Sequence, residues 1–393
     1  MEFSQVIPLL GLPLGELLLR LFLIVGGILV IYGGIKEVLE PLIMVPFGLG
    51  LAVSNASYLA LSVNGVIINN PHLSWNLIGY EWIQYFWLQP FYNFTFMTGL
   101  IAALVFMGIG VLTDISFLLA RPYVSFILAA FAELGTVFTL PIATHLGLNL
   151  KEAASVALIG GADGPIVLFS SVTLAPHLFI PITVVGYLYL SLLYLYHERL
   201  ARVVIPKSMA SKPMPSTGVE VSRSEKIAFA ILMPIILSAI FPSASPLLLS
   251  FFIGVLIREV MIDRYVKLLD EVILSVSTFF LALVLGASTT SDVVLNPVVG
   301  KILLLGITAL VLSSLGGMLG GILLSVVTKG KYNPLLGVAG VSCVPTTAKL
   351  AQKLALKYNP ENYMITELMG PNVAGVVTTA IVAALYLSLF IGT

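Results

Sequence analysis

Residues Gly160–Pro165 have the sequence GGADGP and interrupt an otherwise apolar stretch, Glu152–Ala175. Glycine and proline inside such a stretch break a helix, so the backbone is expected to bend at this hexapeptide. A second interruption, GVSCVP at Gly340–Pro345, divides the stretch Pro334–Leu356. Irregular backbone at membrane depth is tolerated only where it is buried in protein or lines a wet cavity. The two interruptions are therefore expected to meet in the interior of a membrane protein.

Composition independently places the chain in a bilayer. Of its 393 residues, 59% are hydrophobic and 10% are charged, whereas an average soluble domain has about 25% charged residues. The mean hydropathy is +1.06, and a soluble protein of this length has too little interior to bury so much apolar surface. These values exclude a soluble enzyme, a nucleic-acid binder and a disordered scaffold. The single cysteine, Cys343, excludes a disulfide framework and a cysteine-ligated metal cluster.

Ten further apolar runs are expected to cross the hydrocarbon core, which is about 30 Å thick. The short basic segment 259–271, which follows one of them, is expected to lie along the inner surface. The sequence thus predicts an all-α polytopic membrane protein. The expected spans are 17–35, 41–61, 98–120, 122–146 and 178–196 in the first half and 226–241, 246–258, 272–292, 297–328 and 361–390 in the second.

Basic residues indicate how the interrupted segments lie, because Lys and Arg concentrate in cytoplasmic loops. The loop 64–95 has none and is expected outside, whereas 197–226 has six and is expected inside. Three spans already connect these loops, so the segment 152–175 is expected to be a re-entrant hairpin entering from outside. By the same reasoning 334–356 is a hairpin entering from inside. Both termini then lie outside, and single crossings, the alternative, would break the charge bias.

The two halves of the chain resemble each other in the order of their features. GGADGP corresponds to GVSCVP, and Pro41-Leu42 corresponds to Pro246-Leu247. We expect a first repeat at 1–196, a cytoplasmic linker at 197–225 and a second repeat at 226–393. Each repeat has five crossings and one hairpin, so the second copy is inverted, which is typical of secondary-transporter folds. The alternative is a chance similarity of apolar, glycine-rich segments.

Asp163, on the first interruption, is the main candidate for ion binding. An ionisable residue at the membrane midplane costs about 2.5–3.5 kcal/mol on insertion scales and therefore marks an ion path. One carboxylate among neutral oxygens suits a hard monovalent cation, and those oxygens are expected from Ser342, Asn333 and Asn372. The alternative for Asp163 is an N-cap of the following helix, and for the two asparagines it is capping of helix breaks.

Other polar residues in the apolar segments leave two interpretations open. Glu133 and Glu367 are either second ligands or proton carriers, or else protonated or paired buried acids. Tyr187 and Tyr189 either deliver a proton to a midplane site or serve in packing at the membrane interface. Lys349, just after the second interruption, either receives an anion from the cytoplasm or extends to the inner surface.

Several motifs together make the chain similar to the β subunits of sodium-pumping, biotin-dependent decarboxylases, the family that includes oxaloacetate, methylmalonyl-CoA and glutaconyl-CoA decarboxylases. The resemblance runs from about Glu40 to the C-terminus. Its motifs are FMGIG at 106–110, Thr113-Asp114, GGADGP at 160–165, LAPH at 174–177, NPL at 333–335, GVS at 340–342 and MGPNVAG at 369–375.

The resemblance implies that a carboxyltransferase α subunit moves CO₂ to biotin on a carrier protein. Carboxybiotin is then decarboxylated on the β subunit, which consumes a proton and drives Na⁺ out across the prokaryotic cytoplasmic membrane. A small γ membrane subunit and a homo-oligomer of β are also implied. The acyl substrate is not identified, because the α subunit recognises it. The residues that match the family's functional positions are Asp163, Tyr189, Asn333, Gly337, Ser342 and Asn372.

The chain also departs from the family pattern. Lys349 stands where an arginine meets carboxybiotin, and this keeps the charge but loses the forked geometry. Glu133 and Glu367 stand where the family has uncharged or weakly basic residues, which leaves the ion stoichiometry open. Two alternative functions are a Na⁺- or H⁺-coupled symporter of a small carboxylate, which would need no partner subunits, and a passive membrane anchor. Co-purification of a biotinylated protein would favour the pump.

Overall fold

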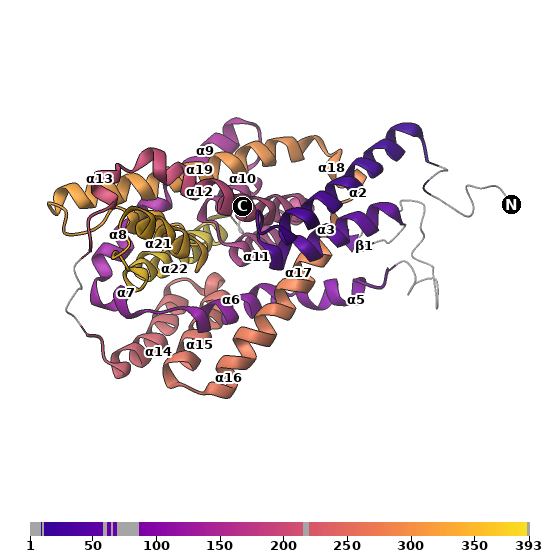
Figure 1. Cartoon of the computed structure of the whole chain (residues 1–393). Coiled ribbons are helices and arrows are strands. Elements are labelled where there is room, and N and C mark those ends of the chain that lie inside the picture. Colours follow the sequence, from indigo (N-terminus) through magenta and orange to yellow (C-terminus); the bar gives the residue numbers. More distant parts are fainter. Residues whose placement is uncertain are drawn as a thin grey trace.

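The computed structural model describes residues 9, 12–57, 61–63, 66–68, 86–214 and 220–390, which are almost entirely helical (Figure 1). Two short strands, β1 (Leu61–Val63) and β2 (Val66–Ile68), pair in antiparallel fashion. Segments labelled η are 3-10 or π-helical turns. In the first half the helical segments are α2 (Leu14–Ile35), α3 (Pro41–Ala56), α5 (Gln89–Phe91), η2 (Tyr92–Phe96), α6 (Leu100–Leu112), α7 (Ser116–Ala120), α8 (Pro122–Ala132), α9 (Leu134–His145), α10 (Leu150–Ala157), η3 (Leu158–Gly161), α11 (Gly164–Leu174), η4 (Pro176–Leu178), α12 (Phe179–Val204) and α13 (Lys207–Ala210).

The second half contains further helical segments, the longest of which is α19. They are α14 (Arg223–Ile240), η5 (Pro242–Ala244), α15 (Ser245–Val260), α16 (Asp263–Lys267), η6 (Leu268–Leu274), α17 (Ser275–Ser288), α18 (Ser291–Val294), α19 (Pro297–Val327), α20 (Leu335–Ala339), α21 (Thr346–Tyr358) and α22 (Ile365–Phe390).

The expected membrane class is confirmed. Among the described residues, seven helical segments are long and apolar enough to cross a bilayer, and eight if the pair 89–96 and 100–112, bent by 63°, forms one span. Each of the ten runs expected to cross contains helix in the structure. Some of these runs are short or interrupted: α3 has 16 residues, and the segment 113–115 separates α6 from α7. The chain is a polytopic membrane protein.

The segment 259–271 is shared between neighbouring helices and is not an element of its own, and its expected place along the inner surface stays a prediction. Helix α15 extends to Val260, and Met261 turns the chain with a φ of 59°. Helix α16 then continues through η6 into α17, so that Asp263–Ser288 forms one candidate span of 26 residues. Arg264 and Lys267 lie at the start of this candidate span, where long basic side chains can reach the membrane surface.

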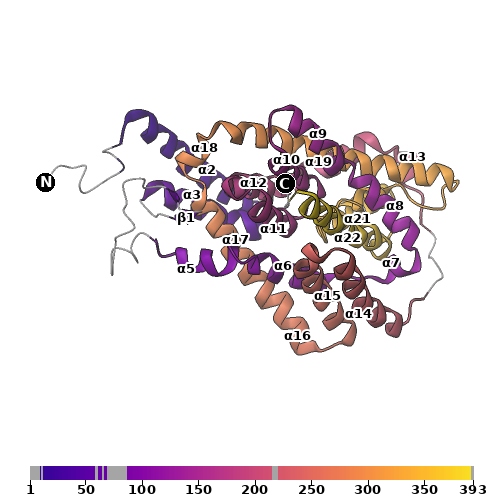
Figure 2. The same ribbon diagram turned by 180° about the vertical axis from the view of Figure 1, so that it is seen from behind.

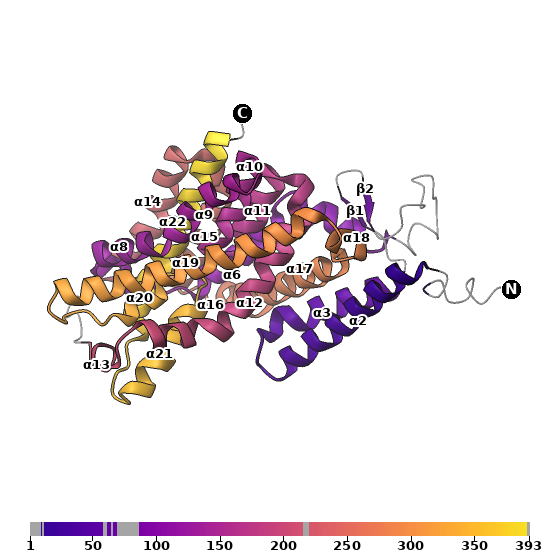
Figure 3. The ribbon, with the colours of Figure 1, turned by 90° about the horizontal axis from the view of Figure 1, so that it is seen from above.

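Two long helices organise the rest of the molecule. Helix α19 extends along one side and packs on α8, α9 and α12, whereas α22 contacts α7, α8, α20 and α21 (Figures 1 and 3). Helices α2 and α3 lie side by side at one end and contact the rest mainly through α17. The reverse view shows α15 beside α6, with α14 packed on the other side of α15 (Figure 2).

Both interrupted segments are pairs of helices joined by irregular backbone. Helix α10 starts with a capping box between Asn149 and Glu152, and it ends in η3. Ala162 has a φ of 56°, and α11 then begins with Pro165 in its first turn. In the second segment, α20 and α21 flank residues 340–345. The members of each pair pack against each other, so each interruption joins two neighbouring helices.

Glycine residues allow the backbones of neighbouring helices to approach closely, as is common in membranes. A Cβ atom added to Gly27 in α2 would lie 2.6 Å from the carbonyl oxygen of Gly48 in α3, and a Cβ on Gly48 would lie 2.6 Å from the Gly27 oxygen. Gly50 faces α17 in the same way and would meet the backbone of Ala287 at 2.8 Å. The middle of α3 is therefore held between α2 and α17 by contacts that tolerate no side chain.

This packing predicts that alanine substitutions at two adjacent glycines of α2 change the free energy of unfolding in opposite directions. Gly27→Ala should lower the unfolding free energy by about 1–3 kcal/mol, because overpacking displaces α3. Gly26→Ala is the matched control, because nothing lies within 4 Å of its added Cβ and alanine favours the helix by up to ~1 kcal/mol. Thermal unfolding of the detergent-purified chain measures both. Equal melting temperatures for the two variants would contradict the packing.

Candidate functional site

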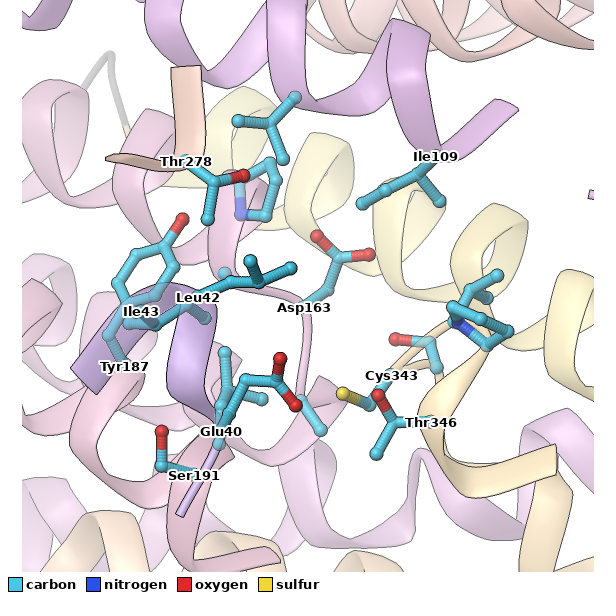
Figure 4. A pocket seen from close by; sticks show the side chains of 18 of the residues that line it. Glu40, Leu42, Ile43, Ile109, Asp163, Tyr187, Ser191, Thr278, Cys343 and Thr346 are labelled. Atoms are coloured by element: carbon cyan, nitrogen blue, oxygen red, sulfur yellow. The ribbon is translucent and has the colours of Figure 1, made fainter. Parts of the chain in front are cut away.

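A cavity of about 400 Å³ lies where the two interruptions meet helices α3, α6, α12 and α17 (Figure 4). Most of its wall is apolar, and a few polar groups converge on it, as in typical binding sites for small molecules. The polar or ionisable residues of the lining are Glu40, Asp163, Tyr187, Ser191, Thr278, Ser342, Cys343, Thr346 and Lys349.

Asp163 sits at the junction between η3 and α11, and its side chain is 4% exposed. One oxygen, Oδ1, accepts a hydrogen bond from the backbone N–H of Ile166 at 3.2 Å, so Asp163 is the N-cap of α11. The carboxylate projects into the middle of the cavity (Figure 4). Both interpretations of this residue are therefore compatible with the geometry, because capping uses one oxygen and leaves the other for a ligand.

The two tyrosines of α12 lie on different sides of the helix. Tyr187 lines the cavity, and its ring lies against Gly164, where an added Cβ would meet ring atoms at 2.6–2.7 Å. Its hydroxyl is buried and has no hydrogen-bond partner among the described residues. Tyr189 instead donates to the carbonyl oxygen of Leu303 in α19 at 2.7 Å. Residues two apart on a helix point in nearly opposite directions, so only Tyr187 reaches the cavity.

Ser342 joins the two interruptions. Its hydroxyl donates a hydrogen bond to the carbonyl oxygen of Gly161, and the residue also lines the cavity. Asn372 supports this arrangement from α22. Its amide nitrogen donates to the carbonyl oxygens of Ala339 and Val341, both at 3.0 Å, and to the hydroxyl of Thr347 at 2.9 Å. The structure thus brings Asp163 and Ser342 to one cavity, with Asn372 behind the second interruption.

Glu133 lies close to the same interruptions but outside the cavity lining. It occupies the joint between α8 and α9 and accepts a hydrogen bond from the hydroxyl of Thr379 in α22. The Thr379 hydroxyl is in turn 3.3 Å from that of Ser342. The other carboxylate oxygen of Glu133 is buried and has no hydrogen-bond partner among the described residues.

Two other sequence candidates lie elsewhere. The amide nitrogen of Asn333 donates to the carbonyl oxygens of Ala210 and Lys212, at 2.9 and 2.7 Å, and its side-chain oxygen accepts from the backbone of Leu335. Asn333 thus ties the linker after α12 to the start of α20. Glu367 is half-exposed in the first turn of α22. Neither residue lines the cavity.

One edge of the cavity carries charge of both signs. Lys349 is exposed on α21, and Glu40 is half-buried in the turn before α3. Burial raises the pKa of the Glu40 carboxyl, while the Leu42 backbone amide and the Lys349 charge offset part of that effect. The Glu40 carboxylate points toward Cys343 and Thr346 (Figure 4). The sequence analysis did not single out Glu40 as a site residue. Its position directly before an apolar run that begins with proline could have indicated it.

Comparisons with known proteins agree with one another. A family profile described as the Na⁺-transporting oxaloacetate decarboxylase beta subunit matches residues 19–390. The chain is 46% identical over 371 residues to a carboxybiotin decarboxylase of Malonomonas rubra, covering 94% of this chain and 92% of that protein. It is 38% identical over 287 residues to the methylmalonyl-CoA decarboxylase subunit beta of Veillonella parvula, covering 73% and 76%. It is 36% identical over 307 residues to an oxaloacetate decarboxylase beta chain 2 of Salmonella typhi, covering 76% and 70%.

Proposed function

Because the chain belongs to the family of beta subunits of Na⁺-transporting decarboxylases, we propose that its cavity is where carboxybiotin loses CO₂ and where the transported Na⁺ is bound. The family and its activity, carboxybiotin decarboxylation coupled to Na⁺ transport, are those that the sequence motifs predicted, and both are confirmed. This assignment decides against the symporter and the passive anchor. The observation that carries the proposal for the site is the carboxylate of Asp163, which faces the cavity.

Asp163 and Ser342 are the proposed Na⁺ ligands from the cavity lining. They supply one negative charge and a hydroxyl oxygen, which suits a hard monovalent cation. Asn372 acts by holding the second interruption through its amide nitrogen. Asn333 is proposed as a structural tie rather than a ligand, because its amide group is fully engaged with the linker and α20.

Carboxybiotin is proposed to enter along the edge that carries Lys349. The ammonium group of Lys349 attracts the carboxylate of carboxybiotin, and it acts as a single charge rather than as the two-pronged donor that arginine provides. The apolar wall, which includes Leu42, Ile109 and Leu281, suits the hydrocarbon part of the biotin ring. Glu40 lies at the same edge and balances the charge of Lys349 when the cavity is empty of anion.

Loss of CO₂ breaks the bond between the carboxyl carbon and the ureido nitrogen, and the electron pair stays on that nitrogen. The nitrogen then requires a proton. Tyr187 is the proposed donor, because its buried hydroxyl has no hydrogen-bond partner among the described residues and its ring lies against Gly164, the residue that follows Asp163. The tyrosine implied by the resemblance, Tyr189, is bonded to Leu303 on the other side of α12.

The finer membrane topology belongs to the same proposal. We propose ten crossings and two re-entrant hairpins, 152–175 and 334–356, in an inverted repeat with the linker 197–225 in the cytoplasm. All basic residues except Arg20, Lys151 and Lys301 then lie inside. The partners are a carboxyltransferase α subunit, a biotin carrier protein and a small γ subunit, with a homo-oligomer of β in the prokaryotic cytoplasmic membrane.

Asp163→Asn should abolish Na⁺-dependent decarboxylation of carboxybiotin while the protein remains folded and assembled. Asparagine is nearly isosteric and still caps α11, so only the negative charge is lost. Turnover of the purified complex over a range of Na⁺ concentrations measures the effect. Near-normal turnover with unchanged Na⁺ dependence would show that Asp163 acts only as a cap.

Lys349→Ala should raise the KM for the carboxylated carrier and leave the Na⁺ dependence nearly unchanged. Lys353→Ala is the matched control, because Lys353 lies one turn further along α21, is exposed, and pairs with Glu198 at 3.6 Å. Steady-state kinetics with the isolated biotin carrier provide the measurement. Equal KM values for the two variants would remove Lys349 from the anion site.

Two phenylalanine substitutions distinguish the roles of the two tyrosines of α12. Tyr187→Phe should reduce turnover by about 100-fold or more, as expected for loss of a proton donor. Tyr189→Phe should cost only about 0.5–1.5 kcal/mol of stability through the lost bond to Leu303, with turnover retained. Single-turnover decarboxylation and thermal unfolding report the two effects. The reverse pattern would make Tyr189 the donor.

A further inference from the structure

Helix α20 ends directly before the second interruption and is too short to hold its own position. It consists of Leu335–Ala339, and all of its residues are buried. An isolated helix of this length is unstable in itself, and the carbonyl groups at its C-terminal end lack partners within the helix. Side chains of neighbouring helices must therefore hold the backbone that leads into Ser342.

Two side chains from different helices bind the carbonyl oxygens at this end of α20. Asn372 of α22 donates to those of Ala339 and Val341. His197 of α12 contacts the carbonyl before them, because its Nε2 atom lies 3.0 Å from the oxygen of Val338. The His197 side chain is 0% exposed. The entrance to the second interruption is thus tied to α22 by one residue and to α12 by the other.

The partners of His197 determine which ring nitrogen carries the hydrogen. A carbonyl oxygen only accepts hydrogen bonds, so Nε2 carries the hydrogen and donates to Val338. The other nitrogen, Nδ1, lies 3.1 Å from the hydroxyl oxygen of Ser314 in α19. Neither partner is acidic, and a buried charge without a counter-charge is costly, so the ring is neutral and Nδ1 accepts from Ser314. One tautomer of His197 therefore connects α12, α19 and α20.

The elements that His197 connects both contribute to the cavity. Helix α12 supplies Tyr187 and Ser191 to the lining, and the second interruption supplies Ser342. His197 itself is not part of the lining, so it reaches the site only through the backbone of Val338. The bond from Nε2 fixes where the second interruption lies relative to α12.

We propose that His197 is a positioning residue, which holds the second interruption against α12 through its Nε2–H group and so sets the apparent affinity for Na⁺. The inference rests on the proposed function, in which Ser342 is a Na⁺ ligand. Loss of this bond leaves the Val338 carbonyl buried without its donor and frees the end of α20 to move. The hydroxyl of Ser342, four residues further on, then no longer has a fixed position.

Two substitutions of His197 separate the two ring nitrogens. The amide nitrogen of glutamine can reach the position of Nε2, so His197→Gln keeps the bond to Val338, whereas the amide of asparagine reaches only the position of Nδ1. In the purified complex, His197→Asn should raise the Na⁺ concentration for half-maximal decarboxylation about tenfold, and His197→Gln should raise it by less than about threefold. This concentration does not depend on the folded fraction, so a general loss of stability would not produce the difference.

Ser314→Ala is the matched control, because it removes the partner of Nδ1 and leaves the bond from Nε2 to Val338. It should lower the melting temperature and keep the Na⁺ dependence of the wild type. Equal Na⁺ dependence of His197→Asn and His197→Gln would overturn the positioning role, as would an equal rise in Ser314→Ala and His197→Asn.

Asp163→Asn distinguishes failure of this inference from failure of the proposed function. If Asp163→Asn abolishes Na⁺-dependent turnover while both His197 variants behave as wild type, the positioning role is overturned and the proposed ion site stands. Unchanged Na⁺ dependence in all three variants would overturn both. A rise in His197→Asn alone would support the positioning role and overturn the assignment of Asp163.

If His197→Asn does not fold, the tautomer provides the test. A variant that keeps only His197 of the four histidines is labelled with ¹⁵N-histidine and purified in detergent. Its NMR spectrum should show the hydrogen on Nε2 and none on Nδ1, and the Nε2 resonance should shift as Na⁺ is added. A hydrogen on Nδ1 alone, or an Nε2 resonance that does not respond to Na⁺, would overturn the proposal.

Discussion

The hydrogen bond from Ser342 to the carbonyl oxygen of Gly161 joins segments that are 181 residues apart in the sequence, and the site depends on it. In a membrane interior, irregular backbone must find its partners within the protein. Each interruption supplies partners for the other or receives them from α22, where Asn372 bonds Ala339 and Val341. The polar groups that these breaks expose are thereby held at fixed positions next to an apolar cavity.

Small residues make this meeting possible. A side chain at Gly375 in α22 would meet the carbonyl oxygen of Gly340 at 2.6 Å, and one at Gly164 would meet the ring of Tyr187. Close approach of backbones therefore determines where the hydroxyl of Ser342 and the carboxylate of Asp163 lie. Glycine residues likewise allow α2 to pack closely on α3, and this packing positions the turn that contains Glu40.

The arrangement separates charge into three places around the interruptions. Asp163 faces the cavity, Glu133 lies behind the first interruption, and Glu40 with Lys349 occupies one edge. Asp163 is part of the first interruption and shares the cavity with Ser342 of the second, and Glu133 is connected to Ser342 through the hydroxyl of Thr379. A movement of either interruption therefore alters the surroundings of both carboxylates. We propose that this shared contact links decarboxylation in the cavity to the binding of Na⁺.

The sequence by itself determined the membrane class, the positions of the two interruptions and the family, and it singled out Asp163 as the candidate ion ligand, because apolar length, Gly-Pro breaks and motif order are local properties of the chain. It did not determine which tyrosine of α12 faces the cavity, because the rotation of a uniformly apolar helix about its axis is set only by packing. Nor did it show that Asn333 bonds to the linker or that Glu133 reaches Thr379, since the latter contact spans 246 residues. Contacts of this kind follow from the meeting of distant segments, and only the tertiary structure decides them.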